Sequence, residues 1–160
     1  MGSDSDWEVM SEGGKILKQF GIPFEMIVTS AHRTPERTHA YAKSAAERGI
    51  KAFIIGAGAA AHLAGVVASE TNLPVIGVPL SATELKGMDA LLATVQMPGG
   101  IPVASMAIGK AGAQNAAIFA TQILATSDAD LAAKLVQFRK DMVAKVEAKN
   151  DKLQARLAEL

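Results

Sequence analysis

The chain has 160 residues, no Cys, and 16 basic against 16 acidic side chains. A chain of this length buries roughly two thirds of its unfolded surface, so one compact domain is expected rather than two. A net charge of zero gives no long-range attraction for nucleic acid or an anionic membrane. The absence of Cys excludes disulfides, a thiolate nucleophile and Cys-type zinc sites, as is typical of a reducing compartment.

The hydrophobic residues are mostly small, since aromatic residues make up only 4% of the chain while 14 residues are Gly. Charged or polar residues interrupt every apolar run before about 18 residues, so no membrane span is predicted. The first residues, Met1–Asp6, have neither the basic nor the apolar stretch of a signal peptide. We therefore expect a soluble cytoplasmic protein with close backbone packing.

Short β-rich runs alternate with longer helical patterns, as in βαβ units around a parallel sheet. The predicted strands are Phe24–Thr29, Ala52–Ile55, Val75–Val78 and Val103–Ile108. The predicted helices are Asp6–Phe20, Thr34–Arg48, His62–Thr71, Lys86–Thr94, Ala111–Ala125 and the segment from Asp128 onward. Because the strands are apolar on both faces, the predicted fold class is α/β, an open three-layer α/β/α sandwich.

Three details of these elements carry further expectations. Thr34 can cap the free amides of its helix, and Pro35 suits the first turn. Doubly wound sheets normally begin with a strand, whereas this chain opens on a Gly/Ser/Asp loop that should follow one, so the first strand is expected to be missing. The helix from Asp128 has an uneven apolar stripe, which packs on another subunit, the reading we favour, or back on its own core. The stripe comprises Leu131, Leu135, Phe138, Met142, Val146, Leu153 and Leu157.

Ligands of open parallel sheets bind beyond the carboxyl ends of the strands, so the loops there are the candidate site. The loop Gly2–Asp6 can hold a phosphate with its hydroxyls and amides and a ribose with a carboxylate, or it simply caps a helix. In the loop Ser30–Pro35, Arg33 offers a fork for phosphate and His32 can move protons near neutral pH. The alternative is a salt-bridged Arg beside a structural His.

A third loop, Gly56–His62, has almost no side chains and lets a ligand approach the backbone. His62 either faces that ligand or caps its helix, and His39 is expected at the surface. The fourth region, Gly77–Ala82 followed by Met97–Pro102, suits a shaped loop beside a site or a subunit boundary. No metal site is predicted, because the three His are scattered along the chain and no pair of carboxylates has the spacing of metal ligands.

Taken together, these motifs resemble the PurE family of purine biosynthesis, in particular its class I N5-carboxyaminoimidazole ribonucleotide mutases. The resemblance covers nearly the whole chain up to Ser127. The matching stretches are Met1–Trp7, Ser30–Pro35, Gly56–Gly58 with Ala60–Leu63, Gly77–Pro79, Gln96–Pro102 and Ala107–Gly112. Several independent motifs in order make coincidence an inadequate explanation.

The resemblance implies a flavodoxin-like sheet and an isomerase that moves a carboxyl group from an exocyclic nitrogen to a ring carbon, without ATP, metal or another cofactor. His32 would be the catalytic histidine, and His62 a second histidine of the site. The implied substrate-binding residues are Ser3, Ser5, Asp6, Ser30, Arg33, Gly58, Ala60 and Ala61. The implied assembly is a homo-octamer. Each subunit would be a single catalytic domain over 1–160, with an α/β core over 1–127 and a C-terminal helix over 128–160 that contacts other subunits.

Two departures from the family pattern stand out. Ala59 takes the place of a Gly found in many relatives, and the family's first strand is absent before Met1. Two other functions are compatible with the same fold class. One is the class II aminoimidazole ribonucleotide carboxylase, which uses carbon dioxide directly, although Met97–Pro102 resembles class I. The other is a non-catalytic nucleotide-binding or receiver-like module, which would give no reason for His32 beside Arg33.

Overall fold

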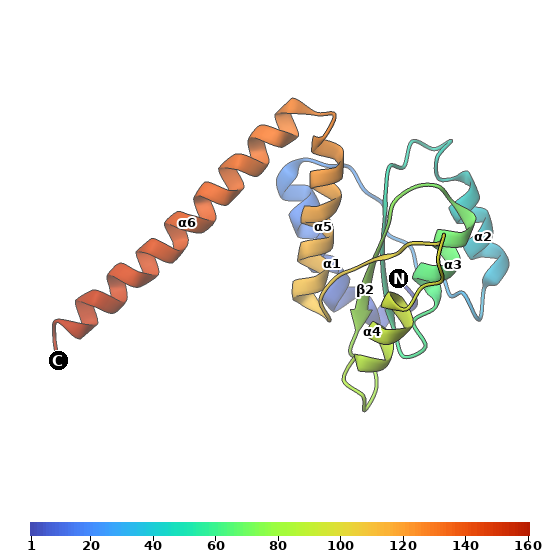
Figure 1. The fold of residues 1–160 in the computed structure, drawn as a ribbon, viewed down its shortest axis with the longest axis horizontal. Coiled ribbons are helices and arrows are strands. Elements are labelled where there is room, and N and C mark those ends of the chain that lie inside the picture. The colour runs from blue at the N-terminus through green and yellow to red at the C-terminus, as the bar shows by residue number, and fades with distance from the viewer. The chain divides into compact units, whose positions relative to one another are not determined.

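The structure, a computed structural model, describes all residues 1–160 and divides them into two compact units, Met1–Thr121 (the core unit) and Gln122–Leu160 (the tail unit). The core unit contains a three-stranded parallel sheet in the order β1-β2-β3. Its middle strand, β2, is labelled among the helices of this unit in Figure 1. Its strands are β1 (Phe53–Gly58), β2 (Val75–Leu80) and β3 (Ala104–Ser105). Its helices are η1 (Asp4–Asp6), α1 (Trp7–Phe20), α2 (Pro35–Ser44), α3 (Leu63–Glu70), α4 (Met88–Val95) and the greater part of α5 (Lys110–Ala125).

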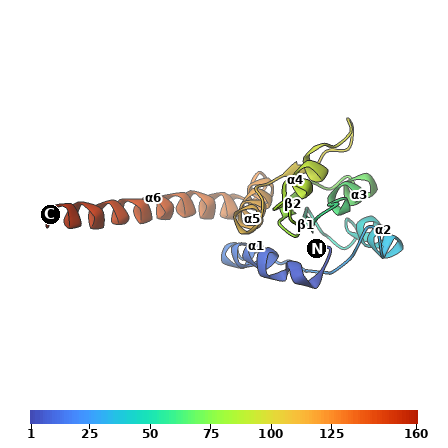
Figure 2. The same cartoon turned by 90° about the horizontal axis from the view of Figure 1, so that it is seen from below.

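Helices cover both faces of the sheet. A Cβ added to Gly56 of β1 would lie 2.8 Å from Cγ of Met10 on α1, and one added to Gly112 of α5 would lie 3.3 Å from Val78 of β2. Gly77 points to the opposite face, toward Ala64 of α3 and toward α4. Thus α1 and α5 lie on one side, and α3 and α4, with α2 beside α3, lie on the other (Figure 2). The predicted three-layer α/β/α class is confirmed.

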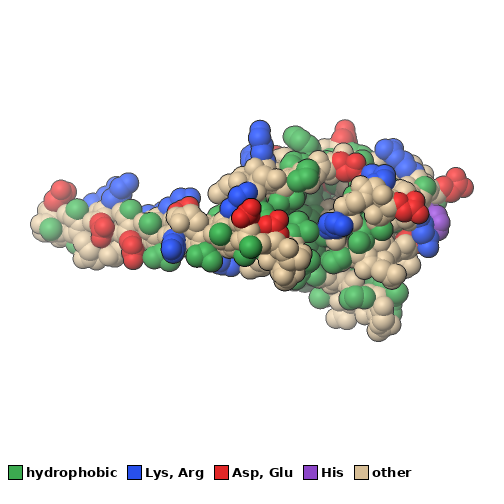
Figure 3. Space-filling view, turned by 90° about the horizontal axis from the view of Figure 1, so that it is seen from above, with side chains coloured by type: hydrophobic (Ala, Val, Ile, Leu, Met, Phe, Trp, Pro, Cys, Tyr) green, Lys and Arg blue, Asp and Glu red, His purple; other side chains and the backbone are tan.

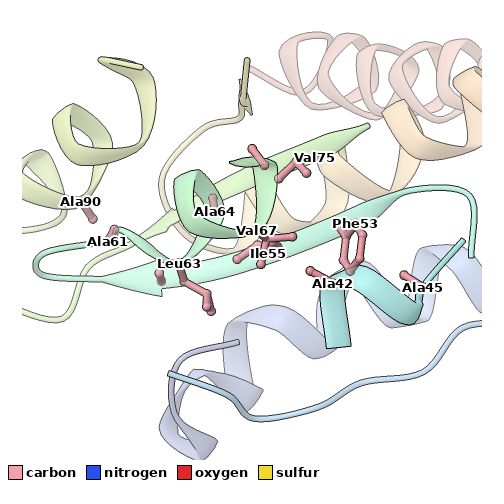
Figure 4. Close-up of a cluster of buried hydrophobic side chains, with 12 residues drawn as sticks. Ala42, Ala45, Phe53, Ile55, Ala61, Leu63, Ala64, Val67, Val75 and Ala90 are labelled. Carbon is pink, nitrogen blue, oxygen red and sulfur yellow. The ribbon is translucent and has the colours of Figure 1, made fainter. Parts of the chain in front are cut away.

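The core is built from small side chains, as the composition predicts. Its main cluster sets Phe53, Ile55 and Val75 of the sheet against helix residues that are largely Ala, Leu and Val (Figure 4). Small residues also let two helices approach closely, since a Cβ on Gly13 of α1 would lie 2.8 Å from the carbonyl oxygen of Ala113 on α5. Backbones this close hold the strand ends, and therefore the loops of the site, in fixed positions.

The strand predicted at Phe24–Thr29 is wrong, because this segment has no regular secondary structure. Its backbone partner is Met1, whose amino nitrogen lies 3.1 Å from the Ile27 carbonyl oxygen and whose carbonyl accepts from Thr29 N at 3.0 Å. Gly2 N in turn donates to Gly56 O of β1 at 3.2 Å. Met1 and Gly2 thus lie between this segment and β1. The segment forms backbone hydrogen bonds with Met1 alone, and pairing with a single residue is too short to make a strand.

The remaining elements follow the sequence closely, with a few shifts of boundary. Strands β1 and β2 extend further than predicted, to Gly58 and Leu80, whereas β3 keeps only two of the six residues predicted. Thr34 does not cap α2, although Pro35 occupies its first turn as expected. The Thr34 hydroxyl bonds instead to the backbone of Ser30, where it closes a turn.

The tail unit consists of the end of α5 and the helix α6 (Ala129–Leu157). The side chain of Asp128 caps α6 by accepting from Leu131 N at 3.0 Å, which agrees with the predicted start. No residue of α6 is buried, and charged and hydrophobic side chains alternate along it (Figure 3). Neither α6 nor any other helix combines the length and hydropathy that crossing a membrane requires.

Candidate active site

The first loop places its polar groups around the start of η1. Ser3 N donates to Oδ2 of Asp6 at 2.9 Å, and Ser5 N donates to Oγ of Ser3 at 3.3 Å, which forms a capping box. The Oγ of Ser5 also lies 2.9 Å from the Oγ of Ser3. Ser3 therefore caps η1, and the same interactions hold two hydroxyls and one carboxylate together at the start of this helix.

The second loop is a tight turn that presents His32 and Arg33 to solvent. Arg33 N donates to Oγ of Ser30 at 3.1 Å, and Thr34 N donates to the Ser30 carbonyl at 2.9 Å. Arg33 forms no ion pair, and its Nη2 lies 3.5 Å from the Gly2 carbonyl oxygen. The alternative of a salt-bridged structural Arg is therefore wrong, which leaves a cation available to an anionic ligand.

The third loop follows β1 and is shaped by a backbone conformation that side chains rarely adopt. Ala59 has φ 52°, in the left-handed region, and His62 N then donates to the Ala60 carbonyl at 2.7 Å. Ala61 is buried, while Ala60 and His62 are exposed. Gly58 packs against Ala82, because an added Cβ would come within 2.6 Å of the Ala82 Cβ. The backbone here is accessible, and its one bulky side chain is His62.

The two histidines of the second and third loops contact each other. Nε2 of His32 lies 3.0 Å from Nδ1 of His62, and the rings meet edge to face with centroids 5.0 Å apart. His62 occupies the N-cap position of α3 but makes no capping hydrogen bond with its side chain. The capping interpretation of His62 is therefore wrong. His39, by contrast, lies at the surface as predicted, where it pairs with Glu70.

Three contacts therefore join the three loops into one site: Arg33 to Gly2, Gly2 to Gly56, and His32 to His62. The site brings together a guanidinium, a carboxylate, serine hydroxyls and a pair of imidazoles, with exposed backbone around Gly58. A guanidinium and hydroxyls suit a phosphate, a carboxylate suits sugar hydroxyls, and imidazole suits proton transfer. The set is adequate for acid–base chemistry on a phosphorylated, hydroxyl-bearing molecule.

Sequence reasoning missed the hydroxyls that support the second loop. Thr38 is fully buried, its Oγ1 lies 2.8 Å from Oγ1 of Thr29, and it donates to the Thr34 carbonyl at 3.1 Å. A signal existed, because Thr34, just before α2, and Thr38, within it, are spaced by one helical turn.

In the first loop, burial lowers the pKa of the Met1 amino group, an effect that the nearby Asp6 carboxylate opposes.

Comparison with known proteins places this site in a family. The sequence model described as AIR carboxylase matches residues 1–145. Over 153 residues the chain is 54% identical to the N5-carboxyaminoimidazole ribonucleotide mutase of Bacillus subtilis, covering 96% of this chain and 94% of that protein. The mutase of Saccharolobus solfataricus is 55% identical over 157 residues, 98% of this chain and 94% of its own length.

The fold agrees with this relationship. The crystal structure of Treponema denticola PurE superposes with a TM-score of 0.84 at 27% identity, covering 96% of this chain and 94% of that one. The family match extends over both the loops of the candidate site and the sheet that carries them. By sequence and by fold, then, this chain belongs to the AIR carboxylase family, also called the PurE family.

Proposed function

We propose that this protein is an N5-carboxyaminoimidazole ribonucleotide mutase, an isomerase that produces 4-carboxy-5-aminoimidazole ribonucleotide in de novo purine biosynthesis. Relatives with this name share more than half of their residues with the chain over nearly its whole length. The observation that carries the proposal is the contact between His32 and His62 at the junction of three loops. It brings two proton-carrying groups next to an unpaired Arg.

The ribonucleotide would lie across the three loops. Arg33, with the hydroxyls of Ser5 and Ser30, would bind its phosphate, since a guanidinium without a protein carboxylate partner is available for one. Ser3 and Asp6 would bind the ribose hydroxyls. The backbone and methyl groups of Gly58, Ala60 and Ala61 would then lie over the imidazole ring.

The carboxyl group would move in two steps. Cleavage of the bond between the exocyclic nitrogen and the carboxyl carbon releases carbon dioxide, and His32 gives a proton to that nitrogen. The ring carbon then attacks the carbon dioxide, and His32 takes the proton which that carbon loses. Recapture requires both fragments to be held as neighbours, because free carbon dioxide would otherwise diffuse away.

A homo-octamer in the cytoplasm is part of the proposal. His32, Arg33 and His62 are exposed on a single chain, so water must be kept out by something beyond this chain's own side chains. Neighbouring subunits would supply that cover, with α6 as one subunit contact and the core followed by this helix as one catalytic domain. Light scattering after size-exclusion chromatography checks the assembly, and a monomer at micromolar concentration would contradict it.

The test offers purified protein two substrates: the N-carboxylated ribonucleotide, or the uncarboxylated one with bicarbonate. A mutase converts the first efficiently, and His32→Asn should retain ribonucleotide binding while losing turnover by about 10²- to 10⁴-fold. The matching family model is described as AIR carboxylase, so the direct carboxylase is the second candidate. Efficient turnover of the second substrate alone would establish it in place of the mutase.

A further inference from the structure

The contact between the two histidines uses a particular nitrogen of each ring. Nε2 of His32 and Nδ1 of His62 are 3.0 Å apart, and neither ring makes another hydrogen bond with the protein. The outer nitrogens, Nδ1 of His32 and Nε2 of His62, are therefore free for a ligand. Because one hydrogen lies between the inner pair, each ring fixes the tautomer of the other.

The location of His62 favours one direction for this hydrogen bond. His62 is the N-cap residue of α3, an eight-residue helix. The amide groups at a helix N-terminus create a partial positive charge, which disfavours a cationic side chain there. In the arrangement that this location favours, Nδ1 of His62 presents its lone pair and accepts from Nε2–H of His32.

We propose that His62 is a positioning residue, which holds Nε2–H of His32 so that Nδ1 of His32 is the atom that exchanges protons with the substrate. This inference rests on the proposed function and deepens it. Protonated His32 gives the Nδ1 proton to the exocyclic nitrogen as the nitrogen–carbon bond breaks and carbon dioxide leaves. When the ring carbon binds the carbon dioxide, its proton returns to Nδ1. The inner hydrogen bond stays in place, so protons and charge balance over the cycle.

Two substitutions at position 62 separate positioning from proton transfer. His62→Asn keeps a hydrogen-bond acceptor, Oδ1, at the place of Nδ1, but it carries no proton for catalysis. His62→Ser is too short to reach His32. Both Asn and Ser are good N-cap residues, so the start of α3 is equally supported in the two variants.

With the N-carboxylated ribonucleotide, we expect the Ser variant to lose about 10²-fold in kcat, because the ring of His32 is no longer held. Its KM should stay within about threefold, since binding is largely unaffected. The Asn variant should stay within about tenfold of the parent in kcat. The matched control is His39→Asn, at the surface pair with Glu70, which should leave both constants unchanged.

A readout that does not depend on activity is the ¹⁵N spectrum of the histidines, with signals assigned through the single variants. Neutral His32 should be the Nε2–H tautomer in the parent and in His62→Asn, and a mixture in His62→Ser. A Ser variant as active as the parent would overturn the inference, and an Asn variant as inactive as Ser would mean that His62 itself carries the proton. If the parent fails to convert the N-carboxylated substrate, the proposed function fails, while the tautomers still test the contact.

Discussion

Replacing Ala59 by Gly should make the protein more stable, although it removes a side chain. Ala59 holds φ 52° in an exposed loop. The left-handed conformation costs an L residue about 1–2 kcal/mol, and Gly adopts it without that cost. Gly also makes the unfolded chain more flexible, which takes back about 0.4–1 kcal/mol. Since an exposed methyl contributes little burial, the net gain is about 0.5–1 kcal/mol.

Thermal unfolding measures this difference. For a chain of this size about 1 kcal/mol changes Tm by about 2–4 °C, so Ala59→Gly should raise Tm by about 1–4 °C. The matched control is Ala60→Gly, the next residue in the same loop, whose φ is not positive. That variant should lose stability by about 0.4–1 kcal/mol. A lower Tm for Ala59→Gly, or equal changes in both variants, would refute the reasoning from backbone strain.

Three further predictions concern packing, buried hydroxyls and pH. Gly13→Ala should destabilise the fold by about 1–3 kcal/mol in denaturant titration, because its Cβ would meet the backbone oxygen of Ala113. Gly14→Ala should cost less, because its Cβ would meet only movable side-chain atoms of Phe24 and Met26. Thr38→Val should lower the free energy of unfolding by about 1–3 kcal/mol, because it removes the hydroxyl partner of buried Thr29. Thr38→Ser keeps that hydroxyl and should retain most of the parent's stability. Burial lowers the pKa of the Met1 amino group, so the unfolded chain binds this proton more readily than the folded chain. The contribution of this group to stability should therefore rise between the lowered pKa and its ordinary value of about 8 and stay level above it. Unfolding titrations over that range, with an amine-blocked sample that should lack the rise, check the sign.

The fold could be predicted wherever a local pattern and its partner are both in the chain. The alternation of apolar runs and helical patterns gave five core helices and the strands β1 and β2 with small shifts of boundary. The segment Phe24–Thr29 was mispredicted because its residues are typical of a strand, yet strand formation depends on a neighbour. β-propensity describes a residue and cannot show whether a partner strand lies beside it.

Within the site, the sequence indicated the loops better than the contacts. The position of His32 and Arg33 after a predicted strand was enough to select that turn, even though the strand itself is irregular. The interaction between His32 and His62 spans 30 residues, so no local pattern could predict it. Thr34 illustrates the same limit, because the preference of Thr for the N-cap position is only a statistical tendency. In the structure the Thr34 hydroxyl bonds to the backbone of Ser30 instead of capping α2.

The backbone bonds of Met1 and Gly2 have a practical consequence for handling this protein. Phe53 N donates to the Pro74 carbonyl on the β2 side of β1. Alternate residues of a strand bond to opposite sides, so the carbonyl of Gly56 faces away from β2, where it accepts from Gly2 N. Any residues attached in front of Met1, an affinity tag included, would therefore start beside the segment Phe24–Thr29, which contacts Met1, rather than in open solvent. β-branched residues there would lengthen the pairing, whereas Pro or a charged residue would disturb it. The choice of the first few attached residues is therefore a choice about the stability of the catalytic core.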